Sequence, residues 1–335
     1  MSNKITINDI ARYAGVSKTT VSFYLNGKYE KMSEETRARI EEVIRKTGYH
    51  PNTMARSLNY KQTNLIGVII GDITNSFANQ IVKGIESCAR EHGYQLILGS
   101  SSYSLDYEKK CLVGMANMGV DGYIVQPTVH FETLWQEMNI DKPIVYFDSP
   151  NSASDGLWVK TNNYEAVMDA ADRMAEQGYE KFVLITADPY VLKTRMERNR
   201  GFTDALDSRK LPYDVIIADE NTTTEMLEEK LKPYLSEENT KSTCIFVCNN
   251  WLLDKAYLVL RKYRDLIPEK IGLLGFDSLD WSELADPSIT TIVQPAYEEG
   301  ECAARILIDR IEKKNEEAPN HILKCRINEM ESTRR

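Results

Sequence analysis

The sequence predicts an α/β protein with an N-terminal helix-turn-helix head and a two-lobed body of parallel, doubly wound sheets. Three observations lead to this prediction. Short helical patterns open the chain, two of them joined by a glycine turn; from Leu65 onward, apolar runs of strand length alternate with amphipathic helices; and this alternation occurs in two series. The 335 residues also exceed what one hydrophobic core usually organises.

The head begins with a helix predicted over residues 7–14, whose apolar side chains recur on one face. Gly15 makes a tight turn, and Ser17 is placed to cap a second short helix that ends at Asn26. A third helix is predicted over residues 33–46, with acidic residues in its first turn and basic residues in its last. This order and spacing favour a helix-turn-helix over a plain three-helix cap.

A connecting segment separates the head from the body. Pro51 ends the third helix, Asn52 can cap a short helix that runs to Leu58, and the following KQTN reads as a polar linker. A helix this short is marginal in isolation. The predicted boundaries are residues 1–50 for the head, 51–63 for the hinge helix and linker, and 64–335 for the body.

The body consists of strands and helices in alternation. The first series contains the predicted strands LIGVIIG, QLILG, GYIVQP and PIVYFD, with helices near 78–92, 106–118 and 131–138. The second contains KFVLIT, DVIIA, CIFVC and IGLLGFD, with helices near 163–177, 199–209, 223–235 and 250–263. Strands joined by crossover helices form parallel sheets that are covered on both faces. Ligands of such folds bind at the carboxyl ends of the strands, here in a cleft between two lobes.

Charge is distributed unevenly along the chain. The net charge is −9, but residues 1–60 carry ten Lys or Arg and six acids, so the head is +4 and the remainder −13. A cationic head on an anionic body favours contact with DNA at one end only.

Other classes of protein are disfavoured. The N-terminus lacks the apolar stretch of a secretory signal, and no apolar run is long enough to span a bilayer, so we expect a cytoplasmic protein. The six cysteines are expected to be free thiols, with Cys244 and Cys248 in a buried strand and not at a metal. There is no phosphate-binding loop, no nucleophile elbow and no histidine cluster, so we expect neither an enzyme nor a cofactor.

Several segments together resemble the LacI/GalR family of bacterial repressors, from Thr6 to Arg335. They are TINDIARYAGVSKTTVSFYLNG, SEETRARIEEVIRKTGYHPNTMARSL, IGVIIGDITNSFANQIVKGIE, VDGYIVQPT, the GF after Arg198, and GFDSLDWSELADPSITTIVQP. Within the family, the chain is similar to repressors of the 2-keto-3-deoxygluconate regulon. The resemblance implies a transcriptional repressor: a DNA-binding head, a hinge, and a body like a periplasmic binding protein that dimerises and binds an effector. A homodimer on a pseudo-palindromic operator is expected.

The resemblance also places DNA contacts on particular residues. The base-reading positions fall on Lys18, Thr19 and Phe23, the phosphate contacts on Ser17, Thr20 and Asn26, and the hinge contacts on Asn52, Ala55 and Leu58. Lys18 could donate to guanine and Thr19 could touch a thymine methyl. Phe23 cannot hydrogen-bond a base, so it packs either on a thymine methyl or in the core of the head. Leu58 is the apolar wedge that enters the minor groove.

Effector contacts are implied in the same way. The positions are Asp72, Ser76 and Phe77 at the exit of the first strand, Arg195, Arg198, Asn250, Trp281 and Asp277. Asp277 would accept hydrogen bonds from ligand hydroxyls and Arg198 would grip the ligand. Trp281 would either stack on a sugar ring or pack in the core of a lobe.

Departures from the family pattern indicate the charge of the effector. In the pairs Asn162-Asn163 and Asn249-Asn250, Asn162 and Asn250 stand where the family usually has aspartate. Arg195 and Arg200 flank Arg198. If these side chains face the ligand, they favour an anion such as 2-keto-3-deoxygluconate, which would release the repressor from its operator. The alternatives are that the arginines point to solvent, that the effector is a neutral sugar, or that a catabolite-control regulator answers a phosphorylated carrier protein.

Overall fold

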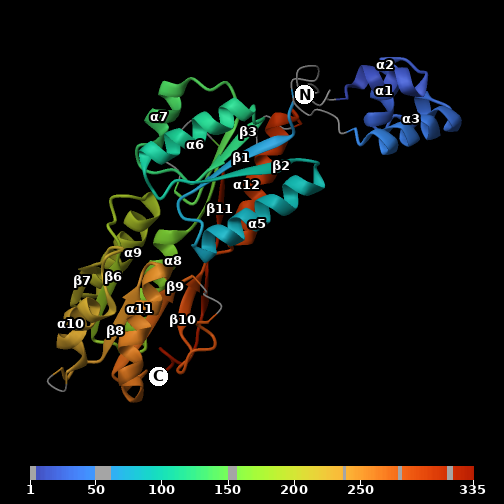
Figure 1. Cartoon of the computed structure of the whole chain (residues 1–335). Helices are drawn as coiled ribbons and strands as arrows, with labels where there is room; N and C mark the ends of the chain where they lie inside the picture. The colour runs from blue at the N-terminus through green and yellow to red at the C-terminus, as the bar shows by residue number, and fades with distance from the viewer. Residues whose placement is uncertain (1–4, 50–61, 150–156, 237–238, 278–280, 315–319) are drawn as a thin grey trace. The chain divides into compact units, whose positions relative to one another are not determined.

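A computed structural model of the chain describes residues 5–49, 62–149, 157–236, 239–277, 281–314 and 320–335. The chain divides into two compact units, residues 1–63 and 64–335, and both are drawn in Figure 1. Within the described residues, no helix is long and apolar enough to cross a membrane.

The head is the predicted helix-turn-helix. It contains α1 (Ile7–Ala14), α2 (Lys18–Leu25), a 3-10 turn η1 (Tyr29–Lys31) and α3 (Glu34–Thr47). Thr6 and Asp9 form a reciprocal capping box at the start of α1. The helices close over a small core of Ile10, Ala11, Ala14, Val21 and Ile40.

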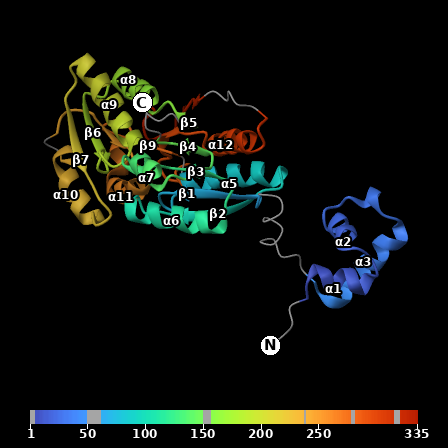
Figure 2. The same ribbon diagram turned by 90° about the horizontal axis from the view of Figure 1, so that it is seen from above.

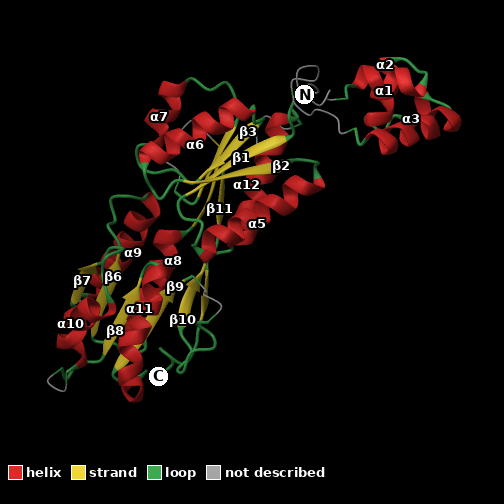
Figure 3. Cartoon of the chain, in the orientation of Figure 1, coloured by secondary structure: helices red, strands yellow, loops and turns green. Residues whose placement is uncertain are grey.

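The first lobe of the body is built on a six-stranded sheet in which every strand pair is parallel. Its order is β11 (His321–Leu323), β5 (Leu157–Thr161), β4 (Ile144–Phe147), β3 (Gly122–Val125), β1 (Leu65–Ile70), β2 (Gln95–Ser100). On one face pack α5 (Ser76–Glu91) and α12 (Ala296–Ile311), and on the other α6 (Leu105–Met118) and α7 (Phe131–Met138). Figure 3 shows the sheet between these helices.

The second lobe repeats this design. Its sheet has the order β12 (Arg326–Asn328), β10 (Thr290–Val293), β9 (Ile271–Phe276), β8 (Thr243–Val247), β6 (Lys181–Thr186), β7 (Tyr213–Ile217). All pairs are parallel except β10 with β12. One face carries α8 (Asn163–Glu176) and α9 (Lys193–Arg209), and the other carries α10 (Thr224–Leu235) and α11 (Asn250–Leu260), which η2 (Arg261–Leu266) extends. The two doubly wound sheets confirm the predicted fold.

The chain passes between the lobes at three described crossovers. They lie between β5 and α8, between β10 and α12, and between β11 and β12. Side chains tie them together: Cys325 N donates to Asn162 Oδ1 at 2.7 Å, and Gln294 Nε2 donates to Thr161 Oγ1 at 2.6 Å. The first lobe is therefore completed by residues from the C-terminal part of the chain.

In the first lobe, α5 and α12 pack backbone against backbone, and Figures 1 and 2 both place them side by side. A Cβ on Gly84 would lie 2.1 Å from the carbonyl oxygen of Tyr297, and one on Gly300 would lie 2.1 Å from that of Ile81. Only glycine permits this approach.

Two sequence predictions need correction. The helix predicted over 199–209 begins six residues earlier, at Lys193. The sequence did not predict its first half, because that half is charged, buries arginine and shows no apolar stripe. Segments β5, β10, α12, β11 and β12 were not predicted. Cys244 and Cys248 are buried at β8 as expected, and the six cysteines are free thiols.

Candidate functional site

The head presents a polar surface at the start of α2. Lys18 and Thr19 are exposed, whereas Val21 is buried in the core of the head. Phe23 is half-buried and lies outside the core of the head, with the Lys31 amino group 5.0 Å from its ring centroid. Packing in that core therefore does not account for Phe23.

The remaining polar residues of α2 also hold the helix in place. Ser17 Oγ accepts from Thr20 N at 3.1 Å, and the two side-chain hydroxyls lie 2.9 Å apart. Asn26 Nδ2 donates to the carbonyl oxygen of Ser22 at 2.7 Å and so fixes the other end. The predicted hinge contacts Asn52, Ala55 and Leu58 lie outside the described residues.

The second candidate site is a cleft between the two lobes of the body. It is lined by Asn75, Phe77, Tyr103, Gln126 and Asp148 from the first lobe, and by Leu192, Thr194, Arg195, Arg198, Asn249, Asn250, Trp251 and Asp277 from the second. Its volume is about 30 Å³, whereas pockets for small molecules usually measure about 300–1,000 Å³. The lobes thus leave room here for water-sized molecules only.

Of the eight residues predicted to contact a ligand, five line this cleft: Phe77, Arg195, Arg198, Asn250 and Asp277. Asp72 does not; its carboxylate accepts from the backbone and hydroxyl of Thr74, both at 2.8 Å. The Oγ of Ser76 is buried outside the lining. Trp281 packs on Tyr257, with ring centroids 5.2 Å apart, and the aromatic residue of the second lobe that lines the cleft is Trp251.

Arg198 is held by three neutral acceptors. Its Nε donates to Asn163 Oδ1 at 2.7 Å, its Nη1 to the carbonyl oxygen of Cys248 at 3.1 Å, and its Nη2 to Gln294 Oε1 at 2.9 Å. The guanidinium also lies 3.6 Å from the ring centroid of Phe276. Because Gln294 and Asn163 both follow crossovers, Arg198 joins the floor of the cleft to the hinge between the lobes.

Arg195 lies one turn earlier on α9 and is bound more loosely. It is 8% exposed, and its Nη1 donates to the carbonyl oxygen of Asp188 at 3.2 Å. Its Nε is buried without a hydrogen-bond partner among the described residues. Burial lowers the pKa of Arg195. Neither Arg195 nor Arg198 forms an ion pair with a described carboxylate.

The asparagines that depart from the family pattern have different roles. Asn250 lines the cleft and donates from Nδ2 to Asn75 Oδ1 at 2.7 Å, which links the two lobes. Asn163 binds Arg198, as described above. Asn162 does not line the cleft, because its Oδ1 accepts from the backbone of Cys325 at a crossover. Asn249 Oδ1 accepts from the backbone of Ala187. Of the two positions where the family usually has aspartate, Asn162 and Asn250, only Asn250 therefore bears on the charge of the cleft.

Two carboxyl groups, those of Asp148 and Asp277, line the cleft, and a third, that of Glu299, lies against Asp148. Burial raises the pKa of Asp277 to about 7, against the opposing effect of Arg198. Glu299 is fully buried, and this burial raises its pKa well above the ordinary value; its Oε1 accepts from Asp148 N at 2.8 Å. Asp148 Oδ2 accepts from Gln126 Nε2 at 2.7 Å. Burial thus favours the neutral forms of Glu299 and Asp277, which leaves the positive charge of the arginines only partly balanced.

The sequence contained a signal for two lining residues that were not predicted. Gln126 directly follows β3 and Asp148 directly follows β4. The carboxyl ends of parallel strands meet at one edge of a sheet, so both positions could have been chosen by that rule. Tyr103, Thr194 and Trp251 carry no comparable signal, because they lie in a loop or in the first turn of a helix.

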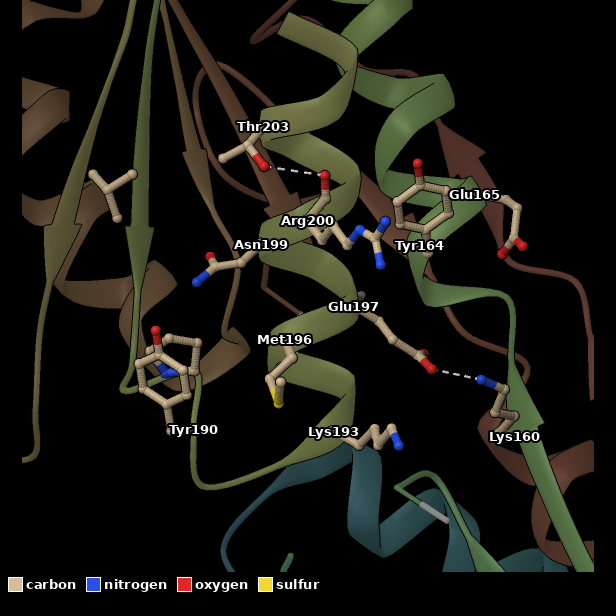
Figure 4. Close-up of a pocket in the computed structure, with 12 residues that line it drawn as sticks. Lys160, Tyr164, Glu165, Tyr190, Lys193, Met196, Glu197, Asn199, Arg200 and Thr203 are labelled. Atoms are coloured by element: carbon tan, nitrogen blue, oxygen red, sulfur yellow. Dashed lines mark hydrogen bonds and ion pairs between the residues drawn. The ribbon is translucent and has the colours of Figure 1, made fainter. Parts of the chain in front are cut away.

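Arg200 points away from the cleft, toward a larger hollow of about 760 Å³ on the outer side of α9 (Figure 4). Its Nε lies 3.3 Å from Asp204 Oδ2, and Lys160 Nζ lies 2.6 Å from Glu197 Oε1 across the same hollow. Because these cations are paired within the protein, the hollow offers less to an anion than the cleft does. Of the two alternatives left open for Arg200, the structure supports the one in which it does not face the cleft.

Comparison with known proteins relates both units to regulators. The pattern described as "Bacterial regulatory proteins, lacI family" matches residues 6–52, and that of a "Periplasmic binding protein-like domain" matches residues 171–333. The chain is 30% identical over 315 residues to the HTH-type transcriptional regulator PtxS of Pseudomonas aeruginosa, covering 94% of this chain and 92% of that protein. It is 28% identical to the transcriptional regulator KdgR of Bacillus subtilis, covering 92% and 91%.

Two further matches extend over almost the entire chain. Catabolite control protein A of Priestia megaterium is 30% identical over 335 residues, covering 98% of this chain and 99% of that protein. The structure of the Lac repressor dimer bound to operator and an anti-inducer superposes with a TM-score of 0.85 at 20% identity, covering 99% of both chains. The fold of the whole chain is thus that of a solved repressor.

Proposed function

Since the chain belongs to the LacI family of bacterial regulatory proteins, it is a DNA-binding transcriptional repressor and not an enzyme, and we propose that a small sugar acid releases it from its operator. Members of this family bind operator DNA and small-molecule effectors, and dimerisation is typical of them. The proposed effector is 2-keto-3-deoxygluconate or a close analogue. The proposed protein is a cytoplasmic homodimer on a pseudo-palindromic operator.

The observation that carries this proposal is the presence of two buried arginines in one cleft. Arg195 and Arg198 both line it, and neither forms an ion pair with a described carboxylate. A buried cation is costly unless an anion accompanies it, and a ligand carboxylate would supply that anion. Asn250 stands where the family usually has aspartate, so it adds no competing negative charge. The match to KdgR is consistent with this effector.

The proposed mechanism uses the narrowness of the cleft. A volume of about 30 Å³ cannot hold a six-carbon acid, so binding requires the lobes to rearrange about the crossovers. In the proposed division of the chain, residues 1–50 bind DNA, 51–63 form the hinge, and 64–335 bind the effector and dimerise. A rearranged body would separate the paired hinge segments, and the heads would lose their register on the operator. The coupling is reciprocal, so operator DNA weakens effector binding by the same factor.

Calorimetric titration of the full-length protein tests the proposed function. Wild type should bind 2-keto-3-deoxygluconate about 10- to 100-fold more tightly than the neutral analogue in which CH₂OH replaces the carboxylate, because the charged hydrogen bond is lost. When the acid and the analogue are compared at the same concentration, only the acid should release the protein from a labelled operator fragment. Equal binding of both compounds would refute an anionic effector, although the chain would remain a LacI-family repressor.

The match to catabolite control protein A supports a second candidate function. In this alternative, the repressor responds to a phosphorylated carrier protein instead of a free acid. A further alternative is that its effector is a neutral sugar. Release of the operator by the acid alone, in a purified system without any carrier protein, would exclude the carrier as a requirement. Dependence on the phosphorylated carrier would establish it.

Lys18 is proposed to read one operator base pair. Lys18→Ala should relax base preference at that position by roughly 1–3 kcal/mol and leave the other positions unchanged. Lys46→Ala is a matched control, since Lys46 is exposed in the last turn of α3 and pairs with Glu42 at 3.2 Å. Binding to a library of operator variants measures the preference. A uniform loss across the library would instead assign Lys18 to a phosphate.

A further inference from the structure

The two arginines of the cleft are not equivalent. We propose that the effector's carboxylate docks on the Nε edge of Arg195, and that Arg198 is a positioning residue that stays bound to the hinge. This inference rests on the proposed function and refines it, because it fixes the end of the cleft at which the acid group lies. The polyhydroxyl part of the ligand then extends toward Asp277 and Asn250.

Arg198 has committed its Nε edge to the protein, although two of the five N–H groups of its guanidinium remain. Its three nitrogens each donate to a protein acceptor, at 2.7–3.1 Å, from three separate segments of the chain. One face of its guanidinium is covered by Phe276. Turning toward a carboxylate would break these bonds and would leave Gln294 Oε1 and Asn163 Oδ1 buried without donors. Since both acceptors follow crossovers, the movement would also loosen the hinge.

Arg195 has the opposite character. Its Nε is buried and unpartnered among the described residues, and its side chain makes one hydrogen bond, to the backbone of Asp188. A buried N–H without an acceptor is costly, and the cost disappears when an acceptor arrives. A carboxylate can take Nε and a neighbouring Nη together in a bidentate pair. Arg195 thus has a free bidentate edge, whereas the corresponding Nε and Nη2 groups of Arg198 already donate to Asn163 and Gln294.

The acid would be held between the lobes at this point. Tyr103 comes from the first lobe, and its ring centroid lies 5.3 Å from the Arg195 guanidinium. The ring occupies its position because Gly71 has no side chain: a Cβ there would lie 2.1 Å from a ring carbon. On the same side, the hydroxyls of Thr194 and Ser149 lie 2.9 Å apart across the lobes. These groups surround Arg195 with polar and aromatic atoms and bring no carboxylate against it.

One acidic side chain of the cleft acts on Arg195 without pairing with it. Asp148 lines the same cleft, and its Oδ2 accepts from Gln126 Nε2 at 2.7 Å. Gln126 is in turn fixed, because its Oε1 accepts from Gly71 N at 2.9 Å. The Oδ1 of Asp148 is buried without a hydrogen-bond partner among the described residues, and the negative charge of Asp148 raises the pKa of Arg195 against the effect of burial. Since Asp148 does not take the Nε of Arg195, that edge stays open to a ligand carboxylate.

Three variants of α9 separate the roles of its arginines. Arg195→Gln should abolish the preference for 2-keto-3-deoxygluconate over its neutral analogue, lowering affinity for the acid about 10- to 100-fold and leaving affinity for the analogue unchanged. Arg198→Gln should lower the affinity for both compounds by the same factor, because it disturbs the hinge and not the contact with the acid group. Arg200→Gln is the control, since Arg200 faces the outer hollow and should change neither affinity.

The outcomes distinguish this inference from the proposed function. If wild type prefers the acid and Arg195→Gln keeps that preference, the inference is overturned and the proposed function stands. If wild type shows no preference for the acid, both fail. Arg195→Lys, which keeps the charge and removes the bidentate edge, should retain part of the preference. Operator binding and melting temperature of each variant verify that it is folded.

Discussion

Replacing Gly300 with alanine should lower the free energy of unfolding of the body by about 3 kcal/mol or more. The new Cβ would lie 2.1 Å from the carbonyl oxygen of Ile81, which is a backbone atom of α5 and cannot rotate away. The helices α5 and α12 would have to separate, and buried residues of the first lobe such as Ile85 and Leu307 would lose contacts. Scanning calorimetry or urea titration measures the loss.

Gly114→Ala provides the matched control. Gly114 lies on α6, and a Cβ there would meet nothing within 4 Å. Alanine is the better helix former, so this variant should be unchanged or more stable by about 0.5–1 kcal/mol. Similar stability of Gly300→Ala and Gly114→Ala would contradict the backbone contact between α5 and α12.

Asp277→Asn should change how the stability of the body depends on pH. Burial raises the pKa of Asp277 from 3.8 to about 7 in the folded protein. Between these values the folded state holds a proton that the unfolded state has lost, so stability falls as pH rises. The full effect of one such group is on the order of 4 kcal/mol. Asparagine resembles the protonated carboxyl and tolerates the left-handed backbone at this position, where φ is 66°.

The comparison of variant with wild type isolates this one group. Urea titrations at several pH values should give nearly equal stabilities at pH 4 and a growing advantage for Asp277→Asn up to about pH 8. Glu299 also favours the folded state at low pH and is present in both proteins, but its contribution cancels only in part, because the charge of Asp277 raises the pKa of Glu299. A stability difference that is constant across pH would show that Asp277 has an ordinary pKa.

Sequence reasoning recovered the parts of the fold that local pattern encodes. The alternation of apolar strands and amphipathic helices identified both lobes, and Gly15 with Ser17 identified the head. The missed elements have weaker local patterns or distant partners. Strand β10 has four residues, half of them threonine, and β11 and β12 have three residues each. Helix α12 has a clear apolar face, but its return to the first lobe depends on long-range packing that no local pattern contains.

The candidate site was predicted in the same uneven way. Family motifs located Arg198, Asp277 and the region around Phe77, all of which line the cleft. They could not say that Arg198 already donates three hydrogen bonds to the protein, because its acceptors Asn163 and Gln294 lie 35 and 96 residues away. The choice between the two roles of Trp281 likewise depended on its packing on Tyr257 in the second lobe, which no motif contains.

The crossovers have a consequence for synthesis of the protein. Strands β1 to β4 emerge from the ribosome early, yet the face that α12 covers is completed only when Ala296–Ile311 have been made. The second lobe lacks only β12 by the time β10 is complete. A nascent chain that pauses before Ala296 therefore exposes apolar surface of the first lobe, and folding of that lobe waits for the synthesis of α12.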